Sequence, residues 1–420
     1  MGDPSPMTLI NSNLTPFRLR YGAFPVFCLL MVCPLISLPF IISGIYNQKR
    51  SAFFLFALFL GLLSWLQVPL GDLFRHTLLY YDEFKRPIDH IFDFSSGFHD
   101  FISTLGKWLL VNNGLPYQYF RLISMTESFY ILSLIFIWMI KNSPRQYTKY
   151  QVFVRFLILF LFFEFIQTTS GVRYCFAAYN YIYGLHLWFN LRKKIPALIF
   201  FLLSICIHDT LLFFIPLSFI LYLGCYSRKR AIIILIVSFI IALSALSALS
   251  IFMGRKAEFY FEGGNSIDGR TFQNVTIYGF ILFTASRICF VPFIYLAFRY
   301  FKSNAVWIRM IVAWTIVMCV FITNNVMIFR IGVFLSAIIP YMIIDMERFR
   351  NIRHSMFNLL LYCGLLNTIS NTINYRNYII NSRFEYIVTP VPVILNYTYE
   401  KGWILDNIDG NSMIKSRFHL

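Results

Sequence analysis

The stretch that decides the fold runs from Glu164 to Pro216 and has the sequence EFIQTTSGVRYCFAAYNYIYGLHLWFNLRKKIPALIFFLLSICIHDTLLFFIP. It holds two long apolar segments, with Arg173 near one end and the pair His208-Asp209 near the other. An arginine inside a membrane span costs about 2.5 to 3.5 kcal/mol on insertion scales, so it normally faces a polar cavity, a partner or a ligand. The stretch therefore predicts polar groups held together by a membrane scaffold.

The composition of the whole chain is that of an integral membrane protein. Of its 420 residues, 58% are hydrophobic, 19% are aromatic and only 13% are charged. The apolar runs are about 20 residues long, the length that an α-helix needs to cross roughly 30 Å of hydrocarbon. Strands of a membrane barrel are about half as long and alternate in polarity. We therefore predict an all-α polytopic membrane protein, with residues 1–420 forming a single integral membrane domain.

The net charge of +17 comes from short basic clusters between the apolar runs. The positive-inside rule places such clusters in the cytoplasm, so the charge indicates topology rather than a nucleic-acid partner. The eight cysteines lie in or beside apolar segments and form no C-x-x-C pair or metal-ligand spacing, so no metal site and no cofactor is expected.

The basic clusters also set the predicted topology. Lys49-Arg50 follows the first apolar segment, which places this end in the cytoplasm and the amino terminus outside. Counting onward gives about twelve spans, near residues 23–45, 52–70, 120–140, 152–167, 172–190, 195–208, 210–224, 231–253, 275–298, 306–323, 330–345 and 355–372. The two pieces beside His208 are about 14 residues each, too short for full spans, which favours a broken or re-entrant pair that buries this histidine.

Three predicted outer segments are too long to be simple turns: residues 71–119, 254–274 and a polar carboxyl-terminal tail, 374–420. The first contains a segment whose apolar and polar residues separate at helical spacing, which predicts a helix lying in the membrane interface. Its apolar side has Phe101, Leu105, Trp108 and Leu109, and its polar side has Ser103, Lys107 and Asn112.

Ionisable residues inside the spans or at their outer edges are the candidates for chemistry, because each must be satisfied at a cost. They are Asp72, Glu127, Glu164, Arg173, His208, Asp209, Arg287 and Arg330. Most of them fall on the predicted outer half of the bilayer. This clustering is the argument for a site, since any one of them alone would most often be part of a structural ion pair.

Each candidate has a structural alternative. Arg173 follows a polar break, Thr168 to Gly171, and can reach an external cavity, or it can pair with Glu164. His208 with Asp209 is suited to acid/base work, although a histidine at a helix break can also simply bond to the backbone.

Arg330 lies at another outer edge, and guanidinium groups hold phosphates in two-pronged fashion, so two or three together suit a diphosphate. Arg287 lies about 12 residues into its span, and a ligand role and an ion pair between helices are equally favoured. Glu127 and Glu164 are expected to be partners of these arginines rather than catalysts.

Several familiar signatures are missing from the sequence. It has no Walker A loop, dinucleotide fingerprint, H-E-x-x-H motif or G-x-S-x-G elbow, which argues against a cytoplasmic nucleotide-using enzyme.

The order of four motifs resembles the EpsG family and the related Wzy-type polysaccharide polymerases of bacteria. They are Gly71-Asp72 followed by Tyr80-Tyr81, then SGVRYCFAAYNYIYGLHLWFNLRKK, then IHDT, and finally FRIGVFLSAIIPYMI. The resemblance covers roughly residues 50 to 350, and it rests on the order and topology of the motifs.

The resemblance implies a GT-C-like glycosyltransferase in the bacterial inner membrane that joins lipid-linked oligosaccharide repeat units on the outer face, with undecaprenyl diphosphate as leaving group. Arg173 and Arg330 would then neutralise the diphosphate, and His208 would be the base for the acceptor hydroxyl. Asp72, Asp209 and Arg287 would contact substrate. The implied partners are the lipid-linked oligosaccharide as donor and acceptor, membrane lipid and a chain-length regulator protein.

Two other functions fit parts of the pattern. A flippase of lipid-linked oligosaccharides would line a cavity with charges along its depth and show repeated halves. A membrane acyltransferase would need a histidine near an arginine in an early span, and no such pair precedes Arg173. The grouping of charges toward one face and the large first outer loop favour the polymerase.

The topology predicts where reporter fusions should be found. Fusions after Lys194 and Arg230 should give cytoplasmic signals, because each follows a basic cluster, and a fusion after Asn265 should give an external one. A paired reporter, alkaline phosphatase and green fluorescent protein, checks each position. An external signal after Lys194 would overturn the map and the outer placement of the arginines.

Overall fold

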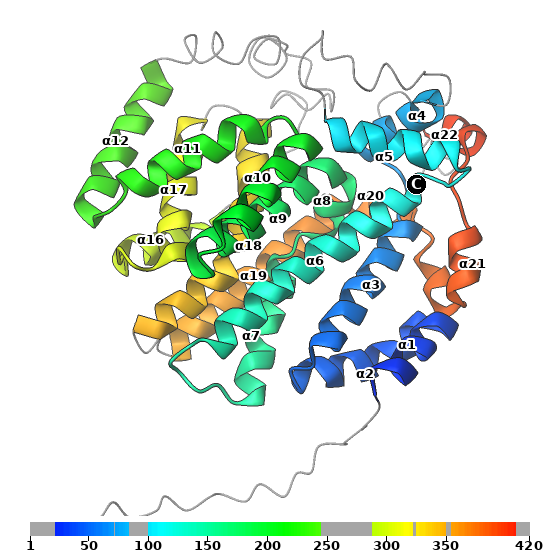
Figure 1. Cartoon of the computed structure of the whole chain (residues 1–420), viewed down its shortest axis with the longest axis horizontal. Coiled ribbons are helices and arrows are strands. Elements are labelled where there is room, and N and C mark those ends of the chain that lie inside the picture. The colour runs from blue at the N-terminus through cyan, green and yellow to red at the C-terminus, as the bar shows by residue number, and fades with distance from the viewer. Residues whose placement is uncertain are drawn as a thin grey trace, which may run out of the picture.

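The computed structural model describes residues 22–70, 72–83, 100–244, 288–321, 325–349 and 354–408, and every regular element in them is a helix (Figure 1). The centre is an antiparallel pair, α3 (Arg50–Leu66) and α6 (Gln118–Lys141). Phenylalanines fill the space between them and α7 (Lys149–Phe162), for example Phe56 against Phe129 at 5.3 Å between ring centroids. We call the end where α3 begins and α6 finishes the basic end, and the other the site end.

The remaining helices pack around this pair. Next in the chain come α8 (Phe165–Ser170), α9 (Val172–Leu185) with a π-helix (His186–Asn190), α10 (Lys194–Ile207), α11 (Leu211–Gly224) and α12 (Arg228–Ser244). After these come α16 (Val291–Arg299), α17 (Val306–Val320), α18 (Asn325–Phe349) and α19 (His354–Asn374). Trp314 of α17 stacks on Phe334 of α18 at 3.9 Å, and α18 also packs on α6, α7 and α9.

The predicted span 23–45 is not one helix. It is divided into α1 (Ala23–Val32) and α2 (Pro34–Tyr46), which pack on each other. Cys33, between them, is extended with φ −156° and ψ 98°. The residue before a proline is disfavoured in the helical region because the proline ring crowds its backbone. Pro34 therefore ends α1 and begins α2, a signal that the hydropathy of the segment hides.

The predicted break at His208 is confirmed. Helices α10 and α11 are 14 residues each, and His208 between α10 and α11 is extended and buried. Within the described ranges, one helix, Gln118–Lys141, has the length and hydropathy to cross a membrane, and six further apolar helices are shorter. The expected total of about twelve spans and the GT-C-like arrangement stay predictions. The segment 254–274 lies outside the described residues.

The segment 374–408, expected to be a polar tail, folds onto the site end of α3. It forms α20 (Arg376–Ile380), a 3-10 turn (Phe384–Val388), α21 (Val391–Asn396) and α22 (Lys401–Asn407). The Tyr399 hydroxyl and the Arg383 backbone N–H both donate to the carbonyl of Leu66, at 2.9 and 3.0 Å. The Trp65 indole donates to the carbonyl of Tyr397 at 2.8 Å.

A buried arginine completes the end of α3. Arg121 of α6 is 1% exposed and donates to the carbonyls of Ser64 and Gln67. The last carbonyls of a helix have no partner within it, and away from water they need donors from elsewhere. Distant parts of the chain therefore meet at this helix end because its carbonyls require them.

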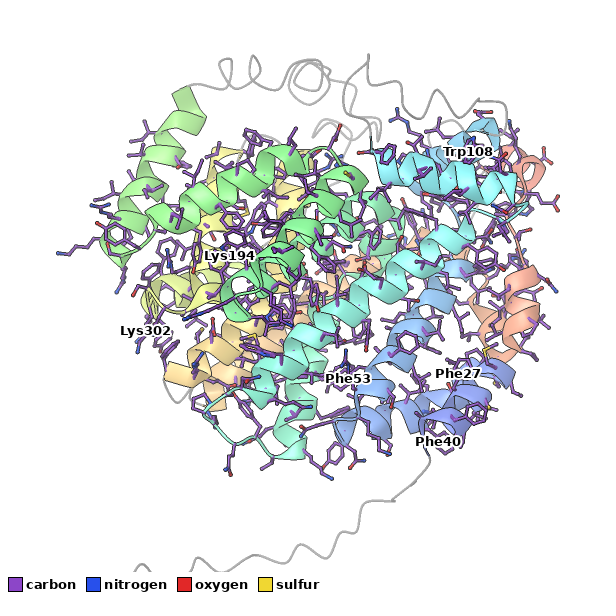
Figure 2. The ribbon with its side chains drawn as sticks, viewed as in Figure 1. Phe27, Phe40, Phe53, Trp108, Lys194 and Lys302 are labelled. Carbon is purple, nitrogen blue, oxygen red and sulfur yellow. The ribbon has the colours of Figure 1, made fainter. Side chains whose placement is uncertain are left out.

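The first predicted outer segment contains α4 (Asp72–Glu83) and α5 (Phe101–Asn112), which pack on each other. The expected amphipathic helix is present, and Figure 2 shows Trp108 near the top of the view, above Phe27 and Phe40. Its polar residues Ser103 and Lys107 are buried against the protein, while Leu109 is exposed. The other apolar residues, Phe101, Leu105 and Trp108, are half-buried, and Asn112 at the end of the helix is exposed.

Contacts at the basic end join several of the predicted cytoplasmic clusters. Lys149 Nζ lies 2.8 Å from Asn47 Oδ1, and Lys302 Nζ lies 4.6 Å from the Phe349 ring. Arg155 of α7 forms a two-pronged ion pair with the buried Glu347 of α18. These contacts support the assignment of the basic loops to one side of the membrane.

The Arg155–Glu347 pair makes a stability prediction. Glu347→Leu leaves a buried guanidinium without its carboxylate and should destabilise the protein by about 3 to 5 kcal/mol. The double variant Arg155→Met/Glu347→Leu should recover most of this loss. As a matched control, Asp82→Asn removes an exposed pair with Lys401 at 3.3 Å and should change stability by less than about 1 kcal/mol.

Thermal unfolding of the purified protein in detergent measures all three variants. A Glu347→Leu variant as stable as the control would show that the buried pair does not hold α7 to α18.

Candidate functional site

Arg173, at the first turn of α9, forms an ion pair with Asp100. Asp100 occupies the N-cap position of α5, where a carboxylate would normally accept hydrogen bonds from the first backbone N–H groups of the helix. Its side chain makes no such bond and instead accepts from the guanidinium of Arg173. Asp100 therefore does not cap α5, and its side chain instead contacts Arg173, 73 positions away in the sequence.

Asp100 also binds the helix break at His208. The backbone N–H of Asp209 donates to Asp100 Oδ1 at 3.1 Å. One carboxylate therefore joins the start of α5, the start of α9 and the turn between α10 and α11. The side chains of Arg173, Asp100 and Asp209 are 17%, 16% and 13% exposed, so this cluster is shielded but within reach of a ligand.

His208 is buried, and its Nδ1 accepts the backbone N–H of Thr210 at 3.3 Å. Nδ1 also lies 3.6 Å from Asp209 Oδ1. The backbone contact that was the structural alternative for this histidine is thus present.

Tyr174 joins the second arginine to the cluster. Its ring meets the His208 ring edge to face, with centroids 5.2 Å apart, and the Arg330 guanidinium carbon lies 5.1 Å from its centroid. Both distances are within the range of favourable aromatic and cation–π contacts. Tyr174 therefore connects Arg330 and His208 to the start of α9, where Arg173 is the preceding residue.

Four of the predicted site residues thus come together: Arg173, His208, Asp209 and Arg330. Asp72 begins α4, but its side chain lies outside the described part, as does the whole of Arg287. The expected partner of Arg173 is different. Arg173 pairs with Asp100 rather than with Glu164, and Glu127 accepts a hydrogen bond from Asn180 at 3.3 Å.

Asp100 is the site residue that sequence reasoning missed. It stands just before the helical pattern that begins at Phe101, where an aspartate is ordinarily explained as an N-cap. No local signal distinguishes a capping aspartate from one that turns away from its helix, so only the packing of α5 on α10 reveals the role.

Asp100, His208 and Asp209 also offer three ligand atoms within 4.8 Å of one another. These are residue types that bind divalent cations. A cation here would compete with Arg173, which already neutralises Asp100.

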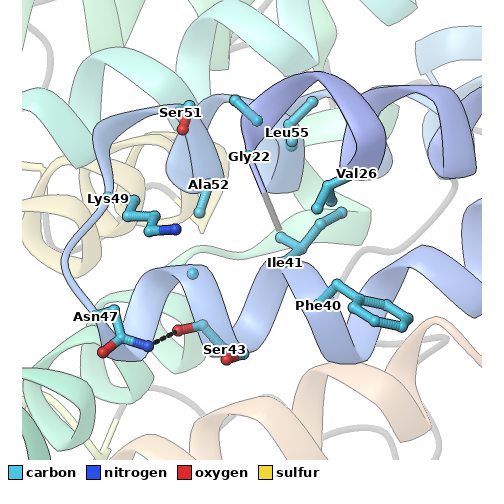
Figure 3. Close-up of a pocket in the computed structure, with 12 residues that line it drawn as sticks. Gly22, Val26, Phe40, Ile41, Ser43, Asn47, Lys49, Ser51, Ala52 and Leu55 are labelled. Atoms are coloured by element: carbon cyan, nitrogen blue, oxygen red, sulfur yellow. Dashed lines mark hydrogen bonds between the residues drawn. The ribbon is translucent and has the colours of Figure 1, made fainter. Parts of the chain in front are cut away.

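A small hollow lies elsewhere, between α1, α2 and α3 (Figure 3). It is lined by Ile41, Ala52 and Leu55, with Asn47 and Lys49 at the basic end. It holds none of the residues of the Arg173 cluster.

Comparisons with known proteins agree with the order of the motifs. Searches of curated proteins and of solved structures returned no match. The model of the EpsG family matches residues 77–387, which includes Asp100, Arg173, His208 and Arg330. This match covers well over half of the chain, and the chain therefore belongs to the EpsG family.

Proposed function

We propose that this protein polymerises undecaprenyl-diphosphate-linked oligosaccharide repeat units on the outer face of the bacterial inner membrane, by inverting glycosyl transfer. Membership of the EpsG family indicates a membrane protein of polysaccharide synthesis with a polymerase-type function. The observation that supports the finer proposal is a cluster at the start of α9. In it Arg173 pairs with Asp100, and Arg330 lies over the Tyr174 ring, which also meets His208.

The proposed reaction breaks the bond between the anomeric carbon of the donor sugar and a diphosphate oxygen. A hydroxyl oxygen of the acceptor sugar attacks the same carbon from the opposite face, which inverts its configuration. The hydroxyl proton passes to a base, and undecaprenyl diphosphate leaves with the bonding electrons. The site must therefore stabilise growing negative charge on the diphosphate and receive one proton.

Arg173 is suited to the diphosphate because only part of its guanidinium is used. One terminal nitrogen pairs with Asp100, and its Nε, although buried, has no hydrogen-bond partner among the described residues. Guanidinium groups hold phosphate oxygens in two-pronged geometry, and the free edge of Arg173 offers this. Arg330, held over the Tyr174 ring, supplies a second positive charge from α18.

The proposal also assigns a membrane side to the long segments between the helices, and a route and partners to the reaction. Residues 71–119, 254–274 and 374–420 are assigned to the outer face, with Asp72, Asp209 and Arg287 on the side of the sugars. Lipid would carry the donor to the site along the apolar outer surfaces of the helices. A chain-length regulator protein is the proposed partner, and no metal or cofactor is assigned to the reaction.

A flippase remains the second candidate function. Its charged groups should be spread through the depth of the membrane domain. Here the described groups that join the cluster sit at helix starts and at the α10–α11 break, which favours a reaction at one surface.

Deletion of the gene tests the function directly. Loss of a polymerase should leave a single repeat unit attached to its lipid, because assembly and export still proceed. Loss of a flippase should leave no surface glycan. Surface polysaccharide separated on a gel distinguishes the two, and a normal polymer ladder in the deletion strain would refute both.

Arg173→Lys tests the role of the guanidinium. Lysine keeps the charge but loses the planar two-pronged geometry, so the rate of polymerisation should fall by about a hundredfold, equivalent to about 3 kcal/mol. Arg173→Ala should be at least as inactive while inserting at normal levels. The assay is polymer length on a gel, normalised to membrane protein by immunoblot.

A purely structural arginine makes the opposite prediction. Arg173→Ala would then lower protein abundance, and adding Asp100→Asn would restore it by removing the unpaired carboxylate. If Arg173→Ala gave the same polymer ladder as the wild type at equal protein abundance, Arg173 would not be a residue of the active site.

A further inference from the structure

Tyr174 lies between the helices that supply the two arginines of the cluster. It follows Arg173 on α9, and its side chain is 6% exposed. The guanidinium carbon of Arg330, on α18, lies 5.1 Å from the centroid of its ring. The His208 ring meets the same ring at 83°, with the centroids 5.2 Å apart. One buried ring therefore contacts both the second arginine and the histidine of the candidate site.

Aromatic packing against α18 fixes the position of this ring. The Tyr174 ring meets the Phe334 ring at 88°, with the centroids 5.9 Å apart, and Phe334 stacks on Trp314 at 3.9 Å. Phe334 follows Arg330 by one helical turn, so both side chains lie on the same face of α18. Phe334 and Trp314 are fully buried, and close packing of this kind leaves the Tyr174 ring little room to turn.

The face of an aromatic ring attracts a cation because the ring quadrupole makes that face negative. A guanidinium within about 6 Å of the centroid is attracted, and the attraction is stronger where water is excluded. The ring carries no net charge, so its attraction does not cancel the positive charge of the guanidinium, as a carboxylate would. A tyrosine can thus hold an arginine in place while the arginine still attracts an anion.

Resting on the function proposed above, we propose that Tyr174 is a positioning residue for polymerisation, whose ring face holds the Arg330 guanidinium where it meets the donor diphosphate. Groups fixed in place before the reaction stabilise developing charge most effectively, because they need no reorganisation as it appears. Arg173 is positioned by different means, through its ion pair with Asp100. The two arginines would therefore respond differently to changes in the ring.

Fluorination of the ring tests this proposal with little change in its size. Phenylalanine and its mono-, di- and trifluorinated forms, introduced at position 174 through an amber codon, weaken the negative face of the ring in steps. Binding of radiolabelled undecaprenyl diphosphate to the full-length protein in nanodiscs is measured beside polymer length on a gel. Tyr174→Phe keeps the ring face and should stay within about threefold of the wild type in both assays. Relative to it, the trifluorinated ring should weaken binding and slow polymerisation by about two- to thirtyfold, the range of one cation–π contact.

Tyr181, on the same helix, is the matched control. Its ring meets the same Phe334 ring at 5.8 Å, and among the described residues no arginine or lysine lies over it. The fluorinated series at position 181 should therefore leave binding and polymerisation at the level of Tyr181→Phe.

Arg330→Met identifies the cation that the ring holds. In this variant fluorination at position 174 should have no further effect on binding, because the group that senses the ring face has been removed. This double-variant comparison also separates the role of the ring from its packing against Phe334, which Arg330→Met leaves in place.

The remaining outcomes each contradict the proposal. Equal binding and polymerisation across the series at position 174, or the same losses at position 181, would show that the ring acts through packing alone. Stronger binding with fluorine would show that the ring competes with the diphosphate. Fluorine sensitivity that persists in Arg330→Met would assign the contact to another group, and an inactive Tyr174→Phe at equal abundance would assign the role to the hydroxyl. Wild-type protein that binds no undecaprenyl diphosphate would instead refute the polymerase function, whatever the variants at position 174 do.

Discussion

The open carbonyls at the end of α3 are the constraint on which the site end depends. A helix that stops inside an apolar environment must find donors for its last carbonyl groups, or the desolvation of each costs a few kcal/mol. Here the Arg121 guanidinium donates to the carbonyls of Ser64 and Gln67. The carbonyl of Leu66 accepts hydrogen bonds from the Tyr399 hydroxyl and the Arg383 backbone N–H. The need for these donors brings α6 and the carboxyl-terminal segment together at the end of α3.

The same junction positions the first arginine of the site. The Gln67 side-chain amide donates to the Ser170 hydroxyl at 3.4 Å, at the end of α8 and three residues before Arg173. Val172, between them, packs in one buried cluster with Tyr117 and Phe120 of the α6 start. Packing of Val172 therefore fixes the backbone beside Arg173, and the ion pair with Asp100 fixes its guanidinium.

The sequence predicted what local pattern determines and missed what distant contacts determine. The helix at Gln118–Lys141 and the break at His208 follow from hydropathy and length, and both are confirmed. The division at Cys33 has a local cause, Pro34, but continuous hydropathy concealed it. Arg173 and Arg330 stood out because charge in a span is costly, and the structure places Arg173 against Asp100 and Arg330 over the Tyr174 ring. Asp100 and the folded carboxyl-terminal segment depend on contacts across many residues, which no single-sequence pattern encodes.

The short helices beside His208 have a consequence for the lipid around them. A helix of 14 residues rises about 21 Å, whereas the hydrocarbon of a typical bilayer is about 30 Å thick. Both helices expose apolar side chains, among them Leu198 and Leu202 on α10 and Leu212 and Leu223 on α11. If lipid covers them, one way to match their short length is a local thinning of the bilayer. A polyprenyl carrier approaching on this side would bring its headgroup deeper into the membrane, toward the level of the arginines.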